Sequence, residues 1–108
     1  MKHIQPTELA AWLREQPAES APLLLDVREP WETAICRIEG AELAPLSHFG
    51  EYLARIDQER PIVCICHHGV RSAYIATVLE HNGWRDVHNL TGGIDAWARE
   101  VDPSMPAY

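Results

Sequence analysis

The chain of 108 residues has a single lysine, Lys2, and lacks any run approaching the roughly 18 apolar residues that span a bilayer. With 16 acidic and 9 basic residues its net charge is −7, so it has no basic stripe for nucleic acid or an anionic membrane. Charged residues interrupt positions 1–20, unlike a secretory signal. We therefore expect no nucleic-acid partner, no membrane partner and a cytoplasmic location.

Cysteine is also scarce, with only Cys36, Cys64 and Cys66. Three cysteines cannot all pair with one another, and disulfides are rare in the cytoplasm. Cys64 lies inside an apolar run and is expected to be a small buried core residue. Cys36 is interpreted as a tolerated loop residue, with a second reactive thiol as the alternative. We expect free thiols that serve chemistry rather than structure.

The remaining composition, 46% hydrophobic and 23% charged, is that of a globular protein, and the length fits one domain over residues 1–108. Apolar runs bounded by turn residues alternate with stretches of helical periodicity. The segments predicted as short strands are residues 3–4, 23–28, 41–46, 62–65 and 87–90. Helices are predicted from a cap at Thr7 to before Pro17, from Pro30 through Ile35, from a cap at Ser47 through Ile56, from Ser72 to Asn82, and over 93–101.

Repeated strand–helix units imply right-handed crossovers and an open, mainly parallel sheet of about five strands with helices on both faces. Residues 62–65 are apolar without alternation, which is typical of a central strand covered on both sides. Ligands of such α/β sheets bind beyond the carboxyl ends of the strands. Cys66 directly follows this strand and is therefore expected at the ligand-binding edge.

Residues 66–71, Cys-His-His-Gly-Val-Arg, connect this strand to the helix predicted from Ser72. Free N–H groups and the dipole at a helix N-terminus favour negative charge, including the thiolate form of a cysteine. Gly69 permits positive φ or a close backbone approach, and successive N–H groups in such a loop can form an anion-binding nest. Arg71 adds a permanent charge and a fork for an oxyanion. The pattern indicates a nucleophilic Cys66 that carries an anionic adduct.

Residues 66–72 closely resemble the active-site loop of single-domain rhodaneses, the persulfide-forming sulfurtransferases. Residues 25–30 (Leu-Asp-Val-Arg-Glu-Pro) resemble the family's early strand motif. Residues 37–41 resemble its His-Ile-x-Gly-Ala segment, and residues 87–97 resemble its C-terminal signature. The segments follow the family's order along the chain. The resemblance implies the rhodanese fold, an α/β architecture.

The resemblance further implies a sulfurtransferase that moves sulfane sulfur from a donor such as thiosulfate to a thiol or cyanide through a persulfide on Cys66. The substrate-binding residues are then the five that follow the nucleophile: His67, His68, Gly69, Val70 and Arg71. Their amides are expected to stabilise the persulfide anion. No metal or organic cofactor is required. The expected partners are a small anionic sulfur donor and a protein that supplies a persulfide or accepts sulfur on a thiol.

Three alternatives remain open at this point. A cysteine phosphatase uses a similar loop but typically needs Cys-x5-Arg, whereas Arg71 comes one residue sooner and Ser72 holds that position. A structural zinc site would use the cysteines and histidines of residues 64–68, although no spaced second ligand pair follows them. A non-catalytic rhodanese-like module that binds a partner would commonly lack the nucleophile.

Outside the loop, Asp26 and Arg28 are expected to brace neighbouring loops through an ion pair. The four tryptophans are expected to be packing residues, and the side chains of His67 and His68 to face solvent. The tail over residues 102–106 contains two prolines, which predict an irregular segment that packs on the domain.

Overall fold

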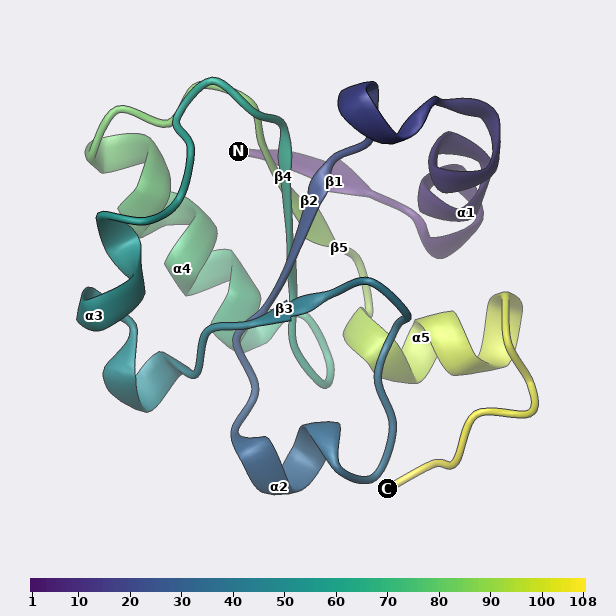
Figure 1. Ribbon diagram of the computed structural model, residues 1–108. Helices are drawn as coiled ribbons and strands as arrows, with labels where there is room; N and C mark the ends of the chain where they lie inside the picture. The colour runs from purple at the N-terminus through teal and green to yellow at the C-terminus, as the bar shows by residue number, and fades with distance from the viewer.

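Five parallel strands form one sheet in the order β1-β5-β4-β2-β3 in the computed structural model, which describes residues 1–108 (Figure 1). The strands are β1 (Lys2–Ile4), β2 (Leu23–Asp26), β3 (Glu42–Leu43), β4 (Ile62–Ile65) and β5 (Val87–Leu90). The order places β4, which leads into the cysteine loop, at the centre of the sheet. The predicted α/β class with an open parallel sheet is confirmed.

Helices cover both faces of this sheet, as predicted. Their bounds are α1 (Pro6–Glu15), α2 (Pro30–Thr33), α3 (Gly50–Leu53), α4 (Val70–His81) and α5 (Gly93–Glu100), with 3-10 turns at Ala18–Ser20 and Leu46–His48. In Figure 1, α3 and α4 lie on one side of the sheet and α1 and α5 on the other. The short helix α2 lies beyond the edge where β2 and β4 end, next to the cysteine loop.

Alternation along β4 divides the hydrophobic core between the two faces. Ile62 and Cys64 belong to the apolar cluster on the side of α3 and α4, whereas Val63 and Ile65 belong to the cluster on the side of α1 and α5. All four side chains are fully buried, as expected of a central parallel strand. Cys66 continues the alternation and lies on the side of α4. The sheet thus directs the sulfur toward the start of that helix.

The start of α1 differs from the prediction. The helix begins at Pro6 rather than after a cap at Thr7. The N–H of Gln5 donates to Oε1 of Glu8 at 2.9 Å in a capping box, and proline is favoured in a first helical turn. Gln5 is outside the usual set of capping residues, which is why the sequence pointed to threonine instead.

The helix predicted from a cap at Ser47 is divided into the turn at Leu46–His48 and α3. Ser47 does not cap a helix, because its Oγ donates to Oε1 of Glu29 at 2.6 Å. Helix α4 begins at Val70, two residues before the predicted Ser72. The earlier start of α4 places Arg71 in the first turn of that helix rather than at the end of a loop.

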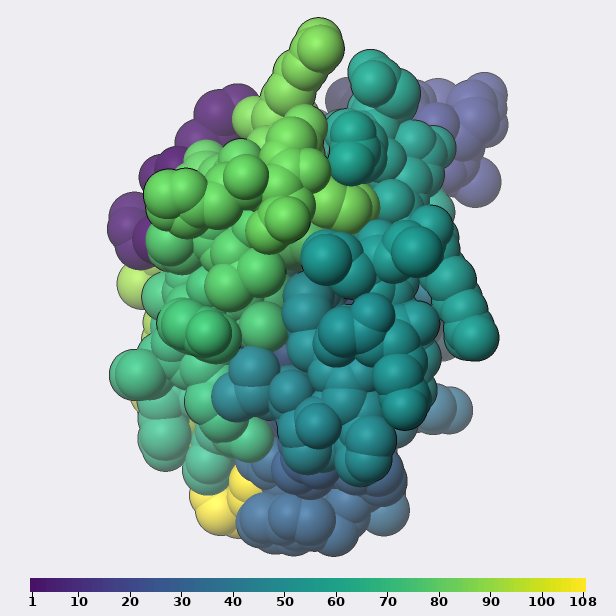
Figure 2. Space-filling view, turned by 90° about the vertical axis from the view of Figure 1, so that its left-hand side faces the viewer, coloured from purple at the N-terminus to yellow at the C-terminus, as the bar shows by residue number.

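The segment after α5 is irregular and packs on the domain, as predicted. Met105 and Tyr108 contact the core cluster on the side of α1 and α5. Figure 2 shows the end of this tail, in yellow, beside α2. Trp31 on α2 contradicts the packing prediction for tryptophans, since it is 64% exposed, with its ring edge-on to that of Tyr108. No helix here has both the length and the apolar character needed to cross a membrane.

Candidate active site

Cys66 lies directly after β4 and is only 1% exposed. Its Sγ accepts a hydrogen bond from the backbone N–H of Gly69 at 3.1 Å, and the hydroxyl oxygen of Ser72 lies within hydrogen-bond distance at 3.2 Å. Both donors lie at the start of α4, where the helix dipole also favours negative charge. The geometry therefore suits a sulfur atom that carries negative charge.

Ser72 is a second polar group in this cradle, and the sequence did not single it out as a ligand of the sulfur. It is fully buried, and its Oγ lies 2.5 Å from Oδ1 of Asn89 as well as near Cys66. The hydroxyl has one proton, so it donates either to the amide oxygen or to the sulfur. Asn89 is fixed by donation from its Nδ2 to the carbonyl oxygen of Gly69 at 3.0 Å. The pair thus offers one further donor to a sulfur that becomes negative.

Two glycines give the loop its shape. Gly69 has a φ of +99°, a conformation that other residues rarely adopt, and it precedes the first turn of α4. Gly93 in the first turn of α5 lies so close to the loop that a Cβ would stand 2.4 Å from the carbonyl oxygen of His67 and 2.5 Å from that of Cys66. The next two N–H groups of α5 donate to these same carbonyls at 2.8 and 3.0 Å. The start of α5 therefore fixes the backbone of the nucleophile.

Arg71 is held by a buried carboxylate. Its Nη1 and Nη2 donate to Oε1 and Oε2 of Glu32 at 2.6 and 2.7 Å. The Arg71 hydrogen bonds hold the pKa of Glu32 down at about 2, and the same pairing raises the pKa of Arg71. The pair ties α2 to the start of α4 and keeps the guanidinium beside the loop.

A buried network continues from Glu32 to β2 and the tail. Tyr108 donates its hydroxyl to Oε2 of Glu32 at 2.8 Å and accepts from Nη1 of Arg28 at 3.0 Å, and burial raises the pKa of Tyr108 to about 12. Arg28 pairs with Asp26 at 2.7 Å and donates from Nη2 to the carbonyl oxygen of Cys36 at 2.7 Å. The predicted ion pair and its bracing role are confirmed.

This network predicts a pH-dependent stability that Glu32→Gln should remove. Because the folded-state pKa of Glu32 is about 2 against an ordinary 4.5, its ionisation stabilises the fold fully above about pH 4.5 and ceases to do so as pH falls toward 2. We expect Glu32→Gln to lower the free energy of unfolding by up to about 3 kcal/mol near neutral pH, with the deficit shrinking in acid. Urea unfolding at several pH values measures this difference.

Glu19→Gln provides the matched control, since Glu19 is exposed in the turn at Ala18–Ser20. It should unfold like the wild type at every pH. A Glu32→Gln deficit that stayed constant between neutral and acidic pH would contradict the assigned ionisation.

The two loop histidines differ in their surroundings. His68 faces solvent as predicted, but His67 is half-buried. The ring of His67 is stacked between those of Tyr108 and His68, with distances between ring centroids of 3.8 and 4.0 Å. Burial and the neighbouring charge of His68 lower the pKa of His67. The nitrogens of both histidines and the carboxylate of Asp95 lie within 4.8 Å of one another. The carboxylate of Asp95 also pairs with Arg99 and lies 3.8 Å from Nδ1 of His68.

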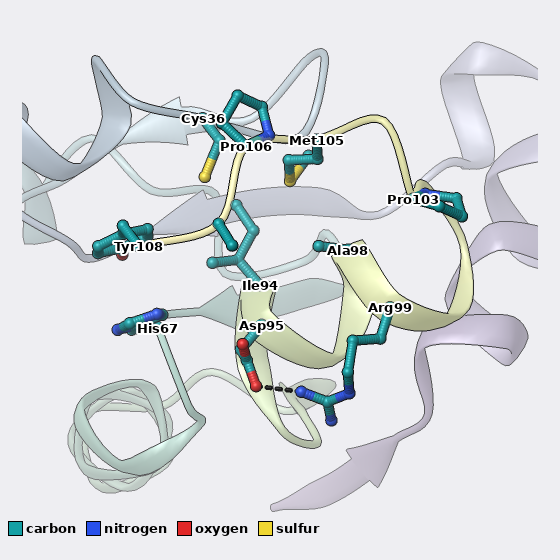
Figure 3. Close-up of a pocket in the computed structure, with 11 residues that line it drawn as sticks. Cys36, His67, Ile94, Asp95, Ala98, Arg99, Pro103, Met105, Pro106 and Tyr108 are labelled. Atoms are coloured by element: carbon teal, nitrogen blue, oxygen red, sulfur yellow. Dashed lines mark hydrogen bonds and ion pairs between the residues drawn. The ribbon is translucent and has the colours of Figure 1, made fainter.

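The other two cysteines occupy different environments. Cys64 is fully buried, as predicted, and burial raises the pKa of its thiol to about 12, which makes it a poor nucleophile at neutral pH. Cys36 is 9% exposed and forms part of the wall of a pocket beside His67 and Tyr108 (Figure 3). Its Sγ lies 3.9 Å from Nη1 of Arg28. All three thiols are free.

The structure brings together the loop that the sequence singled out and adds four residues to it: Glu32, Ser72, Asn89 and Tyr108. Asn89 carries a detectable signal, because a side-chain amide buried in a core strand requires a hydrogen-bond partner. Glu32 and Tyr108 give no such signal in the sequence. Glu32 contacts Arg71 across 39 positions of the chain, and Tyr108 contacts Glu32 across 76 positions.

Comparison with known proteins places this site in a family. The profile of the rhodanese-like domain matches residues 6–100. The chain is 33% identical to the thiosulfate sulfurtransferase GlpE of Pseudomonas fluorescens, over 94% of this chain and 89% of that protein. It is 41% identical to the probable adenylyltransferase/sulfurtransferase MoeZ of Mycobacterium tuberculosis, over 97% of this chain and 26% of that protein.

Solved structures agree with these matches. The rhodanese-like domain protein of Staphylococcus aureus superimposes with a TM-score of 0.83 at 35% identity, covering 94% of this chain and 95% of that one. The chain spans 38% and 26% of the length of two longer curated relatives, and most of the length of the GlpE protein. The fold, the cysteine loop and these similarities lead to one conclusion: the chain belongs to the family of rhodanese-like domains.

Proposed function

We propose that this protein is a sulfurtransferase that moves sulfane sulfur from a donor such as thiosulfate to a thiol or cyanide through a persulfide on Cys66. The observation that carries the proposal is the cradle around Sγ of Cys66, in which the Gly69 N–H and the Ser72 hydroxyl lie at 3.1 and 3.2 Å. These donors favour both a thiolate and the anionic sulfur chain that follows it. Family membership and the thiosulfate sulfurtransferase relative support the same chemistry.

The reaction proceeds in two displacements. The Cys66 thiolate attacks the outer sulfur of thiosulfate, an S–S bond forms, and sulfite leaves with the electron pair of the broken bond. The acceptor then attacks the outer sulfur of the persulfide, which releases Cys66 as a thiolate. No electrons enter or leave the protein over the cycle, and no metal or organic cofactor takes part in either step.

We assign substrate contact to the loop that follows the nucleophile: His67, His68, Gly69, Val70 and Arg71. Glu32 accepts one hydrogen bond from each terminal nitrogen of Arg71, which leaves other N–H groups of the guanidinium for an anionic donor. Glu32 also balances much of the arginine's charge, so the backbone amides and Ser72 carry more of the persulfide anion than the arginine does. Cys66 is 1% exposed, so the donor reaches it when side chains over the loop move aside. In this proposal a protein persulfide can serve as the natural donor and a protein thiol as the natural acceptor. The reaction takes place in the cytoplasm.

The proposed order of steps predicts a burst. Mixing the protein with thiosulfate alone should release one equivalent of sulfite per chain, because the first displacement needs no acceptor. Once the excess thiosulfate has been removed, added cyanide should yield one equivalent of thiocyanate. Stopped assays of sulfite and thiocyanate measure both steps.

Release of sulfite only after cyanide is added would contradict a persulfide intermediate. Release of phosphate from an aryl phosphate, with no sulfite from thiosulfate, would instead favour the cysteine phosphatase. Inactivity in both assays would favour a module that only binds partners.

A further inference from the structure

A pocket of about 280 Å³ lies between α5, the tail and the cysteine loop (Figure 3). Most of its wall is apolar and comes from α5 and the tail: Ile94, Ala98, Pro103, Met105, Pro106 and Ala107. The thiol of Cys36 and the rings of His67 and Tyr108 also line the pocket. The volume suits a small organic group, and the apolar lining suits an uncharged one.

The pocket shares its wall with the active-site loop. Ile94 and Asp95, both pocket residues, donate their N–H groups to the carbonyls of Cys66 and His67 at 2.8 and 3.0 Å. His67 follows the nucleophile directly and also lines the pocket. A ligand body in the pocket therefore lies against the residue next to the reacting sulfur.

The pocket and the sulfur cradle favour ligands of different charge. The only acid and the only arginine that line the pocket, Asp95 and Arg99, are paired with one another (Figure 3). The wall thus offers no free charge for an anion such as thiosulfate. The amide donors of the cradle, by contrast, suit an anion. One site fits an anionic sulfur donor and the other fits an organic molecule.

His67 presents a suitable group at the boundary between these sites. Both faces of its ring are covered, by Tyr108 and His68, so its edge with the two nitrogens is what remains for a ligand. Burial lowers the pKa of His67, and so do the charges of His68 and Arg71, while Asp95 and Glu32 act in the opposite direction. The lowered pKa favours the neutral form of the ring, which can accept a proton.

We propose that this pocket binds the apolar body of an organic thiol that accepts sulfur, and that His67 takes the proton of the thiol. The proposal rests on the sulfurtransferase function above. The acceptor sulfur, freed of its proton, attacks the outer sulfur of the Cys66 persulfide and forms the new S–S bond. The bond to Cys66 breaks, Cys66 leaves as a thiolate, and the proton on His67 returns to the product persulfide. The step needs no oxidant or reductant.

Two acceptors with the same mercaptoethyl arm test the proposal, namely 2-phenylethanethiol and 2-mercaptoethanesulfonate. After loading with thiosulfate, the wild type should transfer sulfur to the phenyl compound with kcat/KM at least about tenfold higher, a difference worth about 1.4 kcal/mol. Ala98→Phe fills the pocket from the wall of α5 and should reduce this preference to near unity. The exposed Glu100→Phe on the same helix is the control and should keep it.

Binding is measured separately in Cys66→Ser, which cannot transfer sulfur under the proposed function. In that protein, 2-phenylethanol should shift the NMR signals of the Ala98 and Ala107 methyl groups, and Ala98→Phe should abolish the binding. Absence of binding, or a wild type without preference for the phenyl thiol, would overturn the pocket proposal while the sulfite burst remained. Absence of the burst with binding intact would overturn the sulfurtransferase function, and with it the pocket's role in transfer.

The role of His67 has its own readout in the variant His67→Asn. In the wild type, the rate of transfer to 2-phenylethanethiol should stay constant as the pH is lowered, until the pH reaches the lowered pKa of His67. In the variant the rate should follow the thiolate fraction of the acceptor and fall about tenfold per pH unit below the pKa of the thiol. Identical pH profiles in the two proteins would show that His67 does not take the proton.

Discussion

Cys66→Ser should lower the rate of thiocyanate formation from thiosulfate and cyanide by at least about a thousandfold. Serine keeps a hydrogen-bonding group in place for the Gly69 N–H and the Ser72 hydroxyl, so the cradle and the fold are expected to survive. Its hydroxyl is not ionised at neutral pH and cannot hold sulfane sulfur in a persulfide. The loss should therefore be in chemistry, with unchanged urea unfolding of the protein.

The other two thiols supply the controls. Cys36→Ala and Cys64→Ala should both retain substantial transfer, although Cys64→Ala should also lose stability because the thiol is fully buried. A Cys66→Ser protein as fast as the wild type would contradict the proposed mechanism. Loss of turnover in a folded Cys36→Ala protein would instead support a relay between two thiols.

Gly93→Ala should be the most damaging single-methyl change for the fold. The added Cβ would stand 2.4 Å from the carbonyl oxygen of His67 and 2.5 Å from that of Cys66, and Gly93 has a φ of +62°. Neither carbonyl can move freely, because each accepts a hydrogen bond from the start of α5. We expect a loss of more than about 3 kcal/mol in the free energy of unfolding, measured in urea, together with reduced sulfur transfer.

Gly40→Ala separates the two causes of this loss of stability, which are the steric clash of the added Cβ and the strain of a positive φ. Gly40 also has a positive φ, +85°, but a Cβ there would meet nothing within 4 Å. Its substitution should therefore cost only the backbone strain, on the order of 1 kcal/mol, with transfer unchanged. If Gly93→Ala unfolded no more easily than Gly40→Ala, the close approach of α5 to the loop would not be a source of stability.

The contrast between these positions also shows which features a sequence can predict. The strands β4 and β5 were predicted at their observed bounds, and for β4 the reason is plain, because an uninterrupted apolar run marks a strand buried on both faces. The early start of α4 was not predicted. Gly69 was interpreted as a loop residue that permits positive φ or a close backbone approach, and the same residue also directly precedes the helix. The close approach of Gly93 depends on two segments distant in sequence and has no local pattern.

The candidate site follows the same division. The six-residue loop combines a strand end, a glycine and an arginine next to a cysteine. A nucleophilic cysteine could therefore be predicted from residues that are neighbours in the sequence. The buried pairing of Arg71 with Glu32, and of Glu32 with Tyr108, depends on how α2 and the tail pack against the loop. Charge and burial at those positions are outcomes of tertiary contact, which local periodicity does not encode.

The location of the transferred sulfur tests the central claim most directly. The protein is incubated with thiosulfate, the thiols and persulfides are alkylated, and the peptides are sequenced by mass spectrometry, with fragmentation between Cys64 and Cys66 separating those two positions. We predict one added sulfur per chain, located on Cys66 and removed by cyanide. An added sulfur on Cys36 or Cys64, or no added sulfur in a protein that still forms thiocyanate, would contradict transfer through a Cys66 persulfide.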